Sequence, residues 1–363
     1  MTDNTAVADE LRDSLRAFLV AECSSEKLRK MFSDPAAQQA FNQNLAELGW
    51  TAVAVPEAQG GMDLGLTELA MVYEELGRCL APSPLLPTQL VVDALVRFGT
   101  SAMQDQYLPR IAVGELYASV SLPDRTPALD LTVEGEQVKI DGRAEFLLNG
   151  ADAGLLLLAA HDGDGKLTWV LLDVTASNAD IERRNTLDLT RHFATLSCDA
   201  LTLPIASVLA TGDSALALQN RLIDHAALAL ASESNGAAQT IFDKTIEYMK
   251  TRTQFDKPIG SFQALKHRVA SLKVKMEAAK AATRAAVQHV VSDDDASKWA
   301  SIAKFTACDT YEAVAYDAVQ LHGGIGYTWE HDCHLFLKRA KLNQQLFGDT
   351  QWHRDRTATL LSF

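Results

Sequence analysis

The stretch Lys250–His267, KTRTQFDKPIGSFQALKH, joins two long helical patterns through a short break. Pro258 and Gly260 mark the break, because proline lacks an amide donor and glycine admits dihedral angles that other residues avoid. The second pattern predicts an amphipathic helix, since apolar residues recur at spacings of three and four: Phe262, Leu265, Val269, Leu272 and Met276.

Arg252, Lys257 and Gln263 crowd this junction between the two predicted helices. A planar guanidinium can clamp a phosphate through two parallel hydrogen bonds, and the free amides at the start of a helix favour an anion. The same residues also fit a solvated charged loop. Their chemistry alone leaves both interpretations open.

The junction resembles a flavin-binding signature of acyl-CoA dehydrogenases, in which an arginine precedes an aromatic residue, a Pro-Ile pair and a Phe-Gln pair. Asp256 stands where the family usually has glycine. A second stretch, QLHGGIGY over 320–327, is similar to the family's other flavin signature. Two signatures in the family's order and at its distance make the resemblance specific. The residues that match the first signature are Arg252, Phe255, Pro258, Ile259, Phe262 and Gln263.

The composition is that of an ordinary soluble globular protein, with 47% hydrophobic and 22% charged residues. The formal net charge of −14 argues against nucleic acid as a partner, because phosphate recognition needs a basic face. The five cysteines are scattered and form no Cys-x-x-Cys pair, which predicts reduced thiols in a cytoplasmic protein. We find no signal-peptide pattern, and no run approaches the about 20 apolar residues that span a membrane.

The pattern of apolar residues changes along the sequence and divides the chain into three predicted domains. Residues 1–113 are predicted to form an N-terminal helical domain, and short apolar runs over 114–208 predict a middle β domain. Residues 209–363 are predicted to form a C-terminal helical bundle. The fold class is therefore α+β, and the resemblance implies an acyl-CoA dehydrogenase-like fold that ends in a four-helix bundle. The predicted C-terminal helices cover 214–250, 261–291, 296–321, 330–345 and 350–361.

The resemblance implies that FAD lies between the β domain and the bundle, and that an acyl-CoA thioester stacks against the flavin. The arginine and glutamine of the first signature match positions that bind FAD from a neighbouring subunit. The glutamine and glycines of the second match positions that meet the adenosine half. An oligomer is therefore implied, and electron-transfer flavoprotein is the expected electron acceptor. The expected cofactor-binding residues are Arg252, Phe255, Gln263, Gln320, Gly323, Gly324, Thr350 and Ser121.

The middle domain departs from the family pattern where the family lines the flavin ring. The family's run is replaced here by ASVSLPDRTP over 118–127, in which Ser121 keeps a hydroxyl. Phe146 keeps an aromatic side chain of a second family motif. Leu148 stands where a threonine hydroxyl would meet the flavin N5 edge, and a leucine cannot donate a hydrogen bond.

The implied reaction needs a carboxylate base that removes a proton next to the thioester carbonyl. The family places this base either on the helix before the first signature, which is Ala226 here, or in the loop before the last helix, near Asp349. Asp349 fits either a base or the N-cap of that helix. Glu233 lies two turns after Ala226 on an otherwise apolar face. It fits either a buried base of raised pKa or a glutamate paired with an arginine or hydroxyl.

Residues 330–334, EHDCH, place two histidines around a thiol and look like part of a metal site. A zinc site needs ligands that converge from separate elements, and the sequence shows no partner pair at a suitable spacing. We therefore expect a helix N-terminus with ordinary capping there, and no metal.

We expect an acyl-CoA dehydrogenase that introduces a double bond α,β to a CoA thioester. The altered middle domain and the missing helix base resemble a bacterial branch of the family in which two unlike subunits form a heterotetramer. That branch acts on bulky substrates such as steroid-derived CoA thioesters. Two alternatives stay open, namely a non-catalytic chain that completes a partner's FAD site, and a flavin monooxygenase on the same scaffold.

Overall fold

The computed structural model describes residues 2–177, 179–292 and 295–362. These residues form two compact units. The helical unit comprises residues 1–33, 66–81 and 227–363, and the sheet unit comprises residues 34–65 and 82–226. The predicted division at residues 113 and 208 rests on changes in the pattern of apolar residues and stays a prediction. Within the described ranges, no helix is both long and apolar enough to pass through a membrane.

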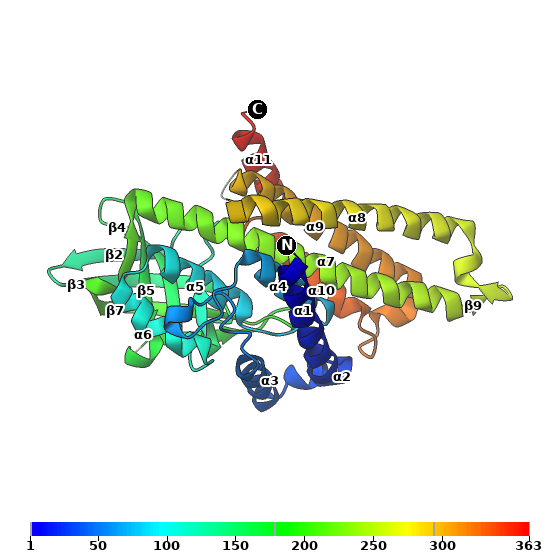
Figure 1. Cartoon of the computed structure of the whole chain (residues 1–363), viewed down its shortest axis with the longest axis horizontal. Helices are drawn as coiled ribbons and strands as arrows, with labels where there is room; N and C mark the ends of the chain where they lie inside the picture. Colours follow the sequence, from blue (N-terminus) through cyan, green and yellow to red (C-terminus); the bar gives the residue numbers. More distant parts are fainter. Residues whose placement is uncertain (1, 178, 293–294, 363) are drawn as a thin grey trace. The chain divides into compact units, whose positions relative to one another are not determined.

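The helical unit is built around α9, against which α8, α10 and α11 pack. Figure 1 shows the long helices α8 and α9 side by side. The helix α7 begins in the sheet unit and continues through the helical unit from residue 227 onward. The elements of this unit are α1 (Thr2–Glu22), α2 (Ser25–Met31), α4 (Leu66–Arg78), α7 (Gly212–Thr251), α8 (Gln263–Ser292), α9 (Ala296–His322), α10 (Cys333–Gln345) and α11 (Thr350–Leu360).

The buried stripe of α8 follows from spacings of three and four residues, which place side chains on one face of a helix. Burial begins only at Leu272, because Phe262, Leu265 and Val269 are half-buried. The sequence predicted one continuous apolar face from Phe262 onward. In this chain, the first two turns of α8 therefore leave part of that face uncovered. The buried residues of α8 are Leu272, Met276, Ala279, Thr283, Ala286 and Val290.

Two glycines allow α4 and α7 to approach closely within the helical unit. A Cβ at Gly77 would lie 2.1 Å from the main-chain oxygen of Glu233. A Cβ at Gly236 would lie 1.9 Å from the main-chain oxygen of Glu74. Both distances are shorter than any van der Waals contact, so only glycine fits at either position.

The sheet unit contains an eight-stranded sheet with the order β6-β7-β3-β2-β4-β5-β8, in which β1 pairs in parallel with β4. Gly135, at φ 63°, lies in the hairpin turn between β2 and β3. The helices of this unit are α3 (Pro35–Glu47), α5 (Leu85–Phe98) and α6 (Ser101–Ala112). The strands are β1 (Ala118–Val120), β2 (Leu129–Glu134), β3 (Gln137–Leu148), β4 (Leu155–Asp162), β5 (Leu167–Asp173), β6 (Asp180–Arg184), β7 (Phe193–Pro204) and β8 (Val208–Thr211).

The core of the sheet unit follows from alternation along the strands, which sends successive side chains to opposite faces. Leu129 and Leu131 on β2 and Val138 and Ile140 on β3 are all buried. The strand β4 is buried along six consecutive residues, as expected for a strand covered on both faces. The helix α5 packs against β1. The predicted α+β class, with helices and a central sheet, is confirmed.

Candidate active and cofactor site

The first signature forms a small hairpin that extends beyond the ends of α7 and α8 (Figure 1). The strands β9 (Thr253–Gln254) and β10 (Lys257–Pro258) pair through a two-residue loop. Both loop residues have positive φ, 54° for Phe255 and 63° for Asp256, as a type I′ turn requires. This geometry is easiest for glycine, so the turn explains why glycine is usual in the family at the position of Asp256.

The side chains of this hairpin face solvent in the single chain. Phe255 is 85% exposed, and its ring meets the edge of Phe262 with centroids 6.1 Å apart. Lys257 places its ammonium 4.5 Å from the Phe262 ring centroid. Arg252 and Gln263 are exposed, and neither side chain has a bonding partner among the described residues. The hairpin thus presents an aromatic ring, a free guanidinium and a free amide on one projecting element.

The second signature lies at the same end of the helical unit. Gln320 is exposed at the end of α9, and a 3₁₀ turn, η6 (Gly323–Tyr327), follows. Gly323 has φ 66° and ψ −143°, a conformation that is essentially limited to glycine. A Cβ placed on Gly323 or Gly324 would meet no atom within 4 Å. The main chain of this turn is therefore open to a ligand.

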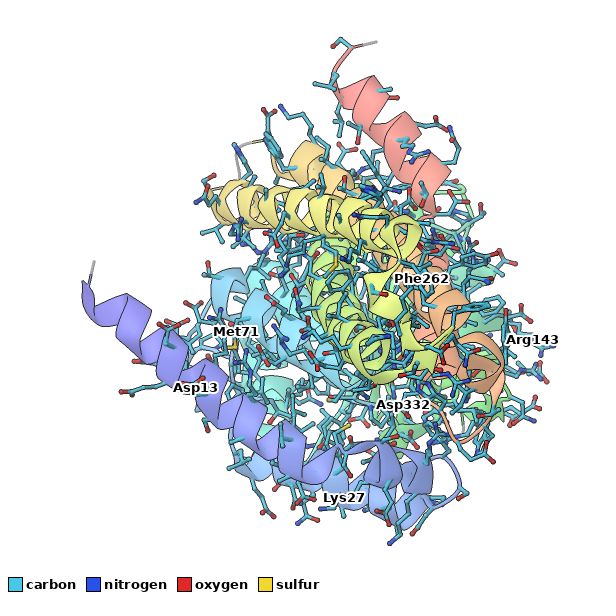
Figure 2. The ribbon with its side chains drawn as sticks, turned by 90° about the vertical axis from the view of Figure 1, so that its right-hand side faces the viewer. Asp13, Lys27, Met71, Arg143, Phe262 and Asp332 are labelled. Atoms are coloured by element: carbon cyan, nitrogen blue, oxygen red, sulfur yellow. The ribbon has the colours of Figure 1, made fainter. Side chains whose placement is uncertain are left out.

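Contacts within the helical unit hold the two signatures near one another. Tyr248, on the last turns of α7, stacks on the His322 ring with centroids 4.3 Å apart. Arg268 on α8 forms a two-bonded ion pair with Asp317 on α9. Figure 2 looks toward this end of the molecule and labels Phe262 and Asp332. We call this region, formed by residues 252–263 and 320–324, the bundle end.

The loop before α11 carries Asp349 and is held by two buried groups. Lys304, 1% exposed, donates from Nζ to the main-chain oxygens of Asn343 at 2.6 Å and Gly348 at 3.3 Å. His353 lies 3.0 Å from the Phe347 oxygen through Nε2. Burial first, and then the charge of Lys304, lower the pKa of His353 to about 3. The neutral ring therefore donates its Nε2–H to that oxygen.

Asp349 is the N-cap of α11, since its side chain accepts a hydrogen bond from the Trp352 amide at 2.8 Å. The carboxylate is nevertheless exposed. Thr350 donates from its hydroxyl to Asp309 at 2.6 Å. The predicted N-cap role of Asp349 is thus confirmed. Because the carboxylate is exposed, its second oxygen is accessible.

The sheet unit places Ser121 in a groove of about 580 Å³ that Phe146 also lines. The Ser121 hydroxyl accepts from the Ala159 amide at 3.3 Å. The guanidinium of Arg125 lies 4.9 Å from the centroid of the Phe146 ring, which is 45% exposed. Leu148 is buried, so its position offers the groove no donor.

Comparison with known proteins decides the family. Residues 216–361 match the family model "Acyl-CoA dehydrogenase, C-terminal domain", and residues 5–115 match "Acyl-CoA dehydrogenase, N-terminal domain". The chain is 33% identical to "Acyl-CoA dehydrogenase IpdE2" of Mycolicibacterium smegmatis, over 93% of each chain. The chain belongs to the acyl-CoA dehydrogenase family. It is therefore an oxidoreductase that acts on the CH–CH bond of CoA thioesters, in a family that is generally flavin-dependent.

Solved structures agree with this assignment. The structure of a variant of the "Tcur3481-Tcur3483 steroid ACAD" is similar with a TM-score of 0.88 and 27% identity, covering 99% of this chain and 98% of that one. The "ChsE4-ChsE5 complex from Mycobacterium tuberculosis" shares the fold, with a TM-score of 0.89 and 24% identity over 98% and 97% of the two chains. The predicted acyl-CoA dehydrogenase-like fold is confirmed.

Glu233 of this acyl-CoA dehydrogenase lies buried among polar partners in the helical unit. Arg339 Nη1 donates to its Oε1 at 2.8 Å, and Asn343 Nδ2 donates to the same oxygen at 3.1 Å. Asn343 Nδ2 also lies 3.2 Å from the Ser234 hydroxyl. The pairing with an arginine, one of the two interpretations of Glu233, is the arrangement present. Arg339 compensates the carboxylate charge.

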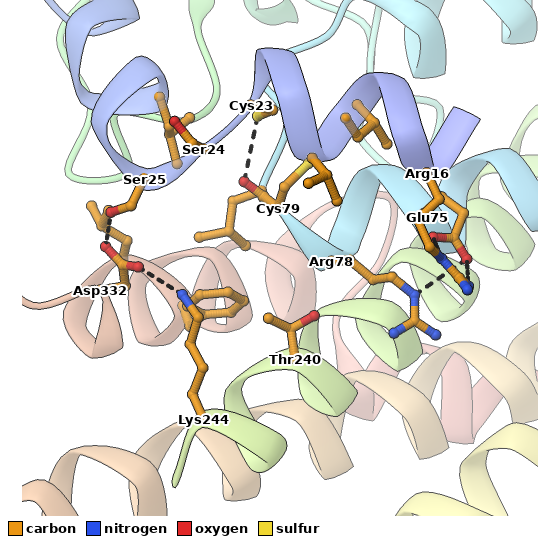
Figure 3. A pocket seen from close by; sticks show the side chains of 16 residues that line it. Arg16, Cys23, Ser24, Ser25, Glu75, Arg78, Cys79, Thr240, Lys244 and Asp332 are labelled. Carbon is orange, nitrogen blue, oxygen red and sulfur yellow. Dashed lines mark hydrogen bonds and ion pairs between the residues drawn. The ribbon is translucent and has the colours of Figure 1, made fainter. Parts of the chain in front are cut away.

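A separate pocket of about 470 Å³ lies between α1, α2, α4, α7 and α10 (Figure 3). Glu75, which is 1% exposed, accepts from Arg16 at 2.6 Å and from Arg78 at 3.2 Å. Farther along the pocket, Lys244 donates to Asp332 at 2.8 Å. None of the predicted cofactor or catalytic residues lines this pocket, so we do not assign it to the dehydrogenase site.

Sequence reasoning missed Lys304 and His353, which hold the Asp349 loop of the dehydrogenase. Lys304 lies three to seven residues from the buried Ala300, Ala307 and Tyr311, so helical spacing alone places it on the buried face. That signal was present in the sequence. The carbonyl groups that it meets belong to residues 343 and 348, and no local pattern identifies them.

Sequence reasoning also missed a polar network beside Ala226 in the sheet unit. Asp93 on α5 accepts from Arg221 at 2.7 Å and lies 3.2 Å from His225 Nδ1. Burial raises the pKa of Asp93, but hydrogen bonds and charges from His225 and Arg221 outweigh it and hold that pKa well below its usual range. Ala226 itself is buried and apolar, so the family's helix position carries no base in this chain.

Proposed function

We propose that this chain is a subunit of an FAD-dependent acyl-CoA dehydrogenase that oxidises a bulky, steroid-derived CoA thioester. The observation that carries the cofactor proposal is the bundle end, where exposed donors and an open glycine turn lie at the same end of the helical unit. The substrate class is supported by the similar structure of the Tcur3481-Tcur3483 steroid ACAD.

The bundle end fits the diphosphate and adenosine of FAD. Arg252 supplies a bidentate donor for a phosphate, and Gln263 and Gln320 supply amides. Gly323 and Gly324 leave the main chain accessible, because no side chain covers them. Bound FAD supplies the acceptor for the hydride that leaves the substrate. The residues of this chain bind and orient it.

The exposure of the bundle end also supports an oligomer. Phe255 is 85% exposed, and the first two turns of α8 bury their apolar face only in part. Uncovered aromatic and aliphatic side chains next to a ligand site favour coverage by another chain. We propose a second acyl-CoA dehydrogenase-like chain as the partner, since the similar Tcur3481-Tcur3483 steroid ACAD is named for two proteins.

Asp349 is our proposed base. Its carboxylate is exposed, and the loop that carries it is held by Lys304 and His353, which provides the fixed position that proton transfer needs. Glu233 is the weaker candidate, because Arg339 compensates its charge and both side chains are buried. We assign Glu233 to the support of α10.

A non-catalytic role is the second candidate function. Asp349 caps a helix, Glu233 pairs with an arginine, and Ala226 replaces the family's helix base. These three observations together favour a chain that only completes the FAD site of its partner. Asp349→Asn separates the candidates, because turnover of the assembled enzyme falls only if this chain is catalytic.

The proposal is tested by purifying the assembled protein from its native host and measuring its flavin content and turnover. We expect a second dehydrogenase-like chain, about one FAD for every two chains, and faster oxidation of steroid-derived than of straight-chain CoA thioesters. A chain that is fully loaded with FAD and turns over alone contradicts the mixed assembly. Equal rates on both substrates contradict the substrate class.

A further inference from the structure

His322, His331 and Cys333 bring three metal-ligating side chains together in the helical unit. Their ligand atoms all lie within 4.8 Å of one another. His322 ends α9, while His331 and Cys333 precede and begin α10. The sequence showed only the two residues near α10, and the folded chain supplies the third from a separate element.

The His322 ring is already oriented as a ligand would be. Its Nδ1 lies 2.8 Å from the Ala318 main-chain oxygen, and because a carbonyl only accepts, this nitrogen carries the proton. The Nε2 lone pair is therefore free for a cation. Metal-binding histidines usually donate their other ring N–H to a carbonyl or carboxylate in this way. The ring also stacks on Tyr248, with ring centroids 4.3 Å apart, which further fixes its orientation.

His331 and Cys333 complete a nitrogen and sulfur donor set. The His331 and His322 ring centroids are 4.5 Å apart. Cys333 places Sγ 3.5 Å from His322 Nδ1, which carries the proton, so the thiol has to turn toward the Nε2 side of the ring to share a cation with it. Donor atoms bound to one zinc ion lie roughly 3.4–3.8 Å apart in tetrahedral geometry. The donor atoms therefore have to move closer together around the ion, which side-chain rotation can supply.

His331 requires one rearrangement. Its Nδ1 now accepts a hydrogen bond from the Cys333 amide at 3.2 Å. A cation at this nitrogen displaces that bond, and a cation at Nε2 requires the other tautomer. Either change is local, because His331 is only half-buried and lies before α10 rather than within it.

An acidic pocket gives a cation access to the cluster. A cavity of about 520 Å³ is lined by His322 and His331, by the carboxylates of Asp243, Glu247, Glu330 and Asp332, and by the ammonium of Lys244. Arg29 and Lys250 also pair with two of these carboxylates, Asp332 and Glu247, so the four carboxylates exceed the three cations by one negative charge, which favours a cation. Asp332 is engaged by Ser25 and Lys244 (Figure 3), so Glu330 or a water is the available fourth ligand.

We propose that His322, His331 and Cys333 form a binding site for a divalent cation of the zinc class. Two imidazoles and a thiolate are a donor set that suits zinc rather than magnesium or calcium, which prefer oxygen. The ion joins the end of α9 to the start of α10. Because Gly323 follows His322 directly, the same ion steadies the turn at the bundle end.

The test uses Co²⁺ as a spectroscopic substitute for Zn²⁺ in the untagged full chain after treatment with a chelator. We expect one Co²⁺ per chain and a near-ultraviolet absorption band from thiolate-to-cobalt charge transfer. Zn²⁺ should displace the Co²⁺ and abolish the band. The readout needs neither FAD nor turnover, so it is independent of the proposed function.

Four variants decide whether the cluster is the site. Cys333→Ser should abolish the band, and His331→Ala should weaken Co²⁺ binding by about tenfold or more. Cys198→Ser, in the sheet unit, and His289→Ala, on α8, are matched controls and should behave as the wild type. The absence of a band in the wild type overturns the proposal. A band that survives in Cys333→Ser also overturns it. Circular dichroism checks that each variant is folded.

Discussion

Glu233 and Arg339 form a buried ion pair, with Nη1 2.8 Å from Oε1 and side-chain exposures of 7% and 1%. Arg339→Met leaves the carboxylate without its cation in a dry environment. We expect a loss of about 3–5 kcal/mol in the free energy of unfolding, because an uncompensated buried charge is costly. The double variant with Glu233→Gln should recover much of that loss. Denaturant unfolding measures both, and a loss below about 1 kcal/mol for Arg339→Met contradicts the account.

Asp349→Asn separates capping from catalysis. Asparagine caps a helix as well as aspartate does, so the midpoint of thermal unfolding should stay the same. A lost base should lower the turnover of the assembled enzyme by about 100-fold or more. Asp34→Asn, at the N-cap of α3, is the matched control and should leave turnover unchanged. Full turnover in Asp349→Asn assigns the chain to the non-catalytic role.

Gly348→Ala should destabilise the loop that carries Asp349. Gly348 has φ 93°, and an added Cβ would lie 2.6 Å from a ring carbon of Trp352 and 3.0 Å from His353 Nε2. Backbone strain and the two clashes together should cost about 2 kcal/mol or more in the free energy of unfolding.

Gly163→Ala provides the control for this substitution. Gly163 lies in the turn between β4 and β5, and an added Cβ would meet nothing within 4 Å. Gly163→Ala should change the free energy of unfolding by no more than about 0.5 kcal/mol. Equal unfolding midpoints for the two variants would show that the Phe347–Asp349 loop is not held as described.

The Asp93 network predicts a pH dependence of stability. The pKa of Asp93 in the folded state is held below the value of about 3.9 that is usual in unfolded chains. A carboxyl group of this kind contributes stability above the unfolded pKa, and that contribution is lost as the pH falls below about 4. Arg97, Arg221 and His225 all face this carboxylate.

Asp93→Asn tests that dependence. The variant should be less stable than the wild type at pH 7, and the difference between the two should narrow as the pH falls from about 5 to about 3. Denaturant unfolding of both proteins at a series of pH values measures this difference in the free energy of unfolding. A difference that stays constant over this range would assign the contribution of Asp93 to packing rather than to its charge.

Local sequence patterns predicted most of the helical framework. The spacing of apolar residues predicted a helix over 296–321, and α9 covers Ala296–His322. The strands β6 and β7 lie inside the predicted β domain, but no apolar run marks either of them, since exposed residues dominate β6 and the second half of β7 and weaken the alternation typical of a strand. Pattern reasoning detects burial that repeats along one element, and these strands show too little of it.

Contacts between distant residues account for what the sequence did not reveal. The arginine that pairs with Glu233 lies 106 positions away. His322 ends α9, whereas His331 precedes α10 and Cys333 begins it. Helical spacing places Glu233 and Lys304 on buried faces, but it does not identify the groups they meet. Those partners follow only from the way the helices pack.

Flavin content tests the central claim most directly. We would purify the assembled protein with its partner chain, record its visible spectrum, and quantify FAD for the wild type, Arg252→Ala and the control Arg284→Ala on the exposed face of α8. The account predicts a yellow wild type and control, with FAD affinity reduced about tenfold or more in Arg252→Ala through loss of a charge-assisted contact to phosphate. A wild type that stays colourless when FAD is supplied, or an Arg252→Ala protein that retains FAD as the wild type does, would contradict it.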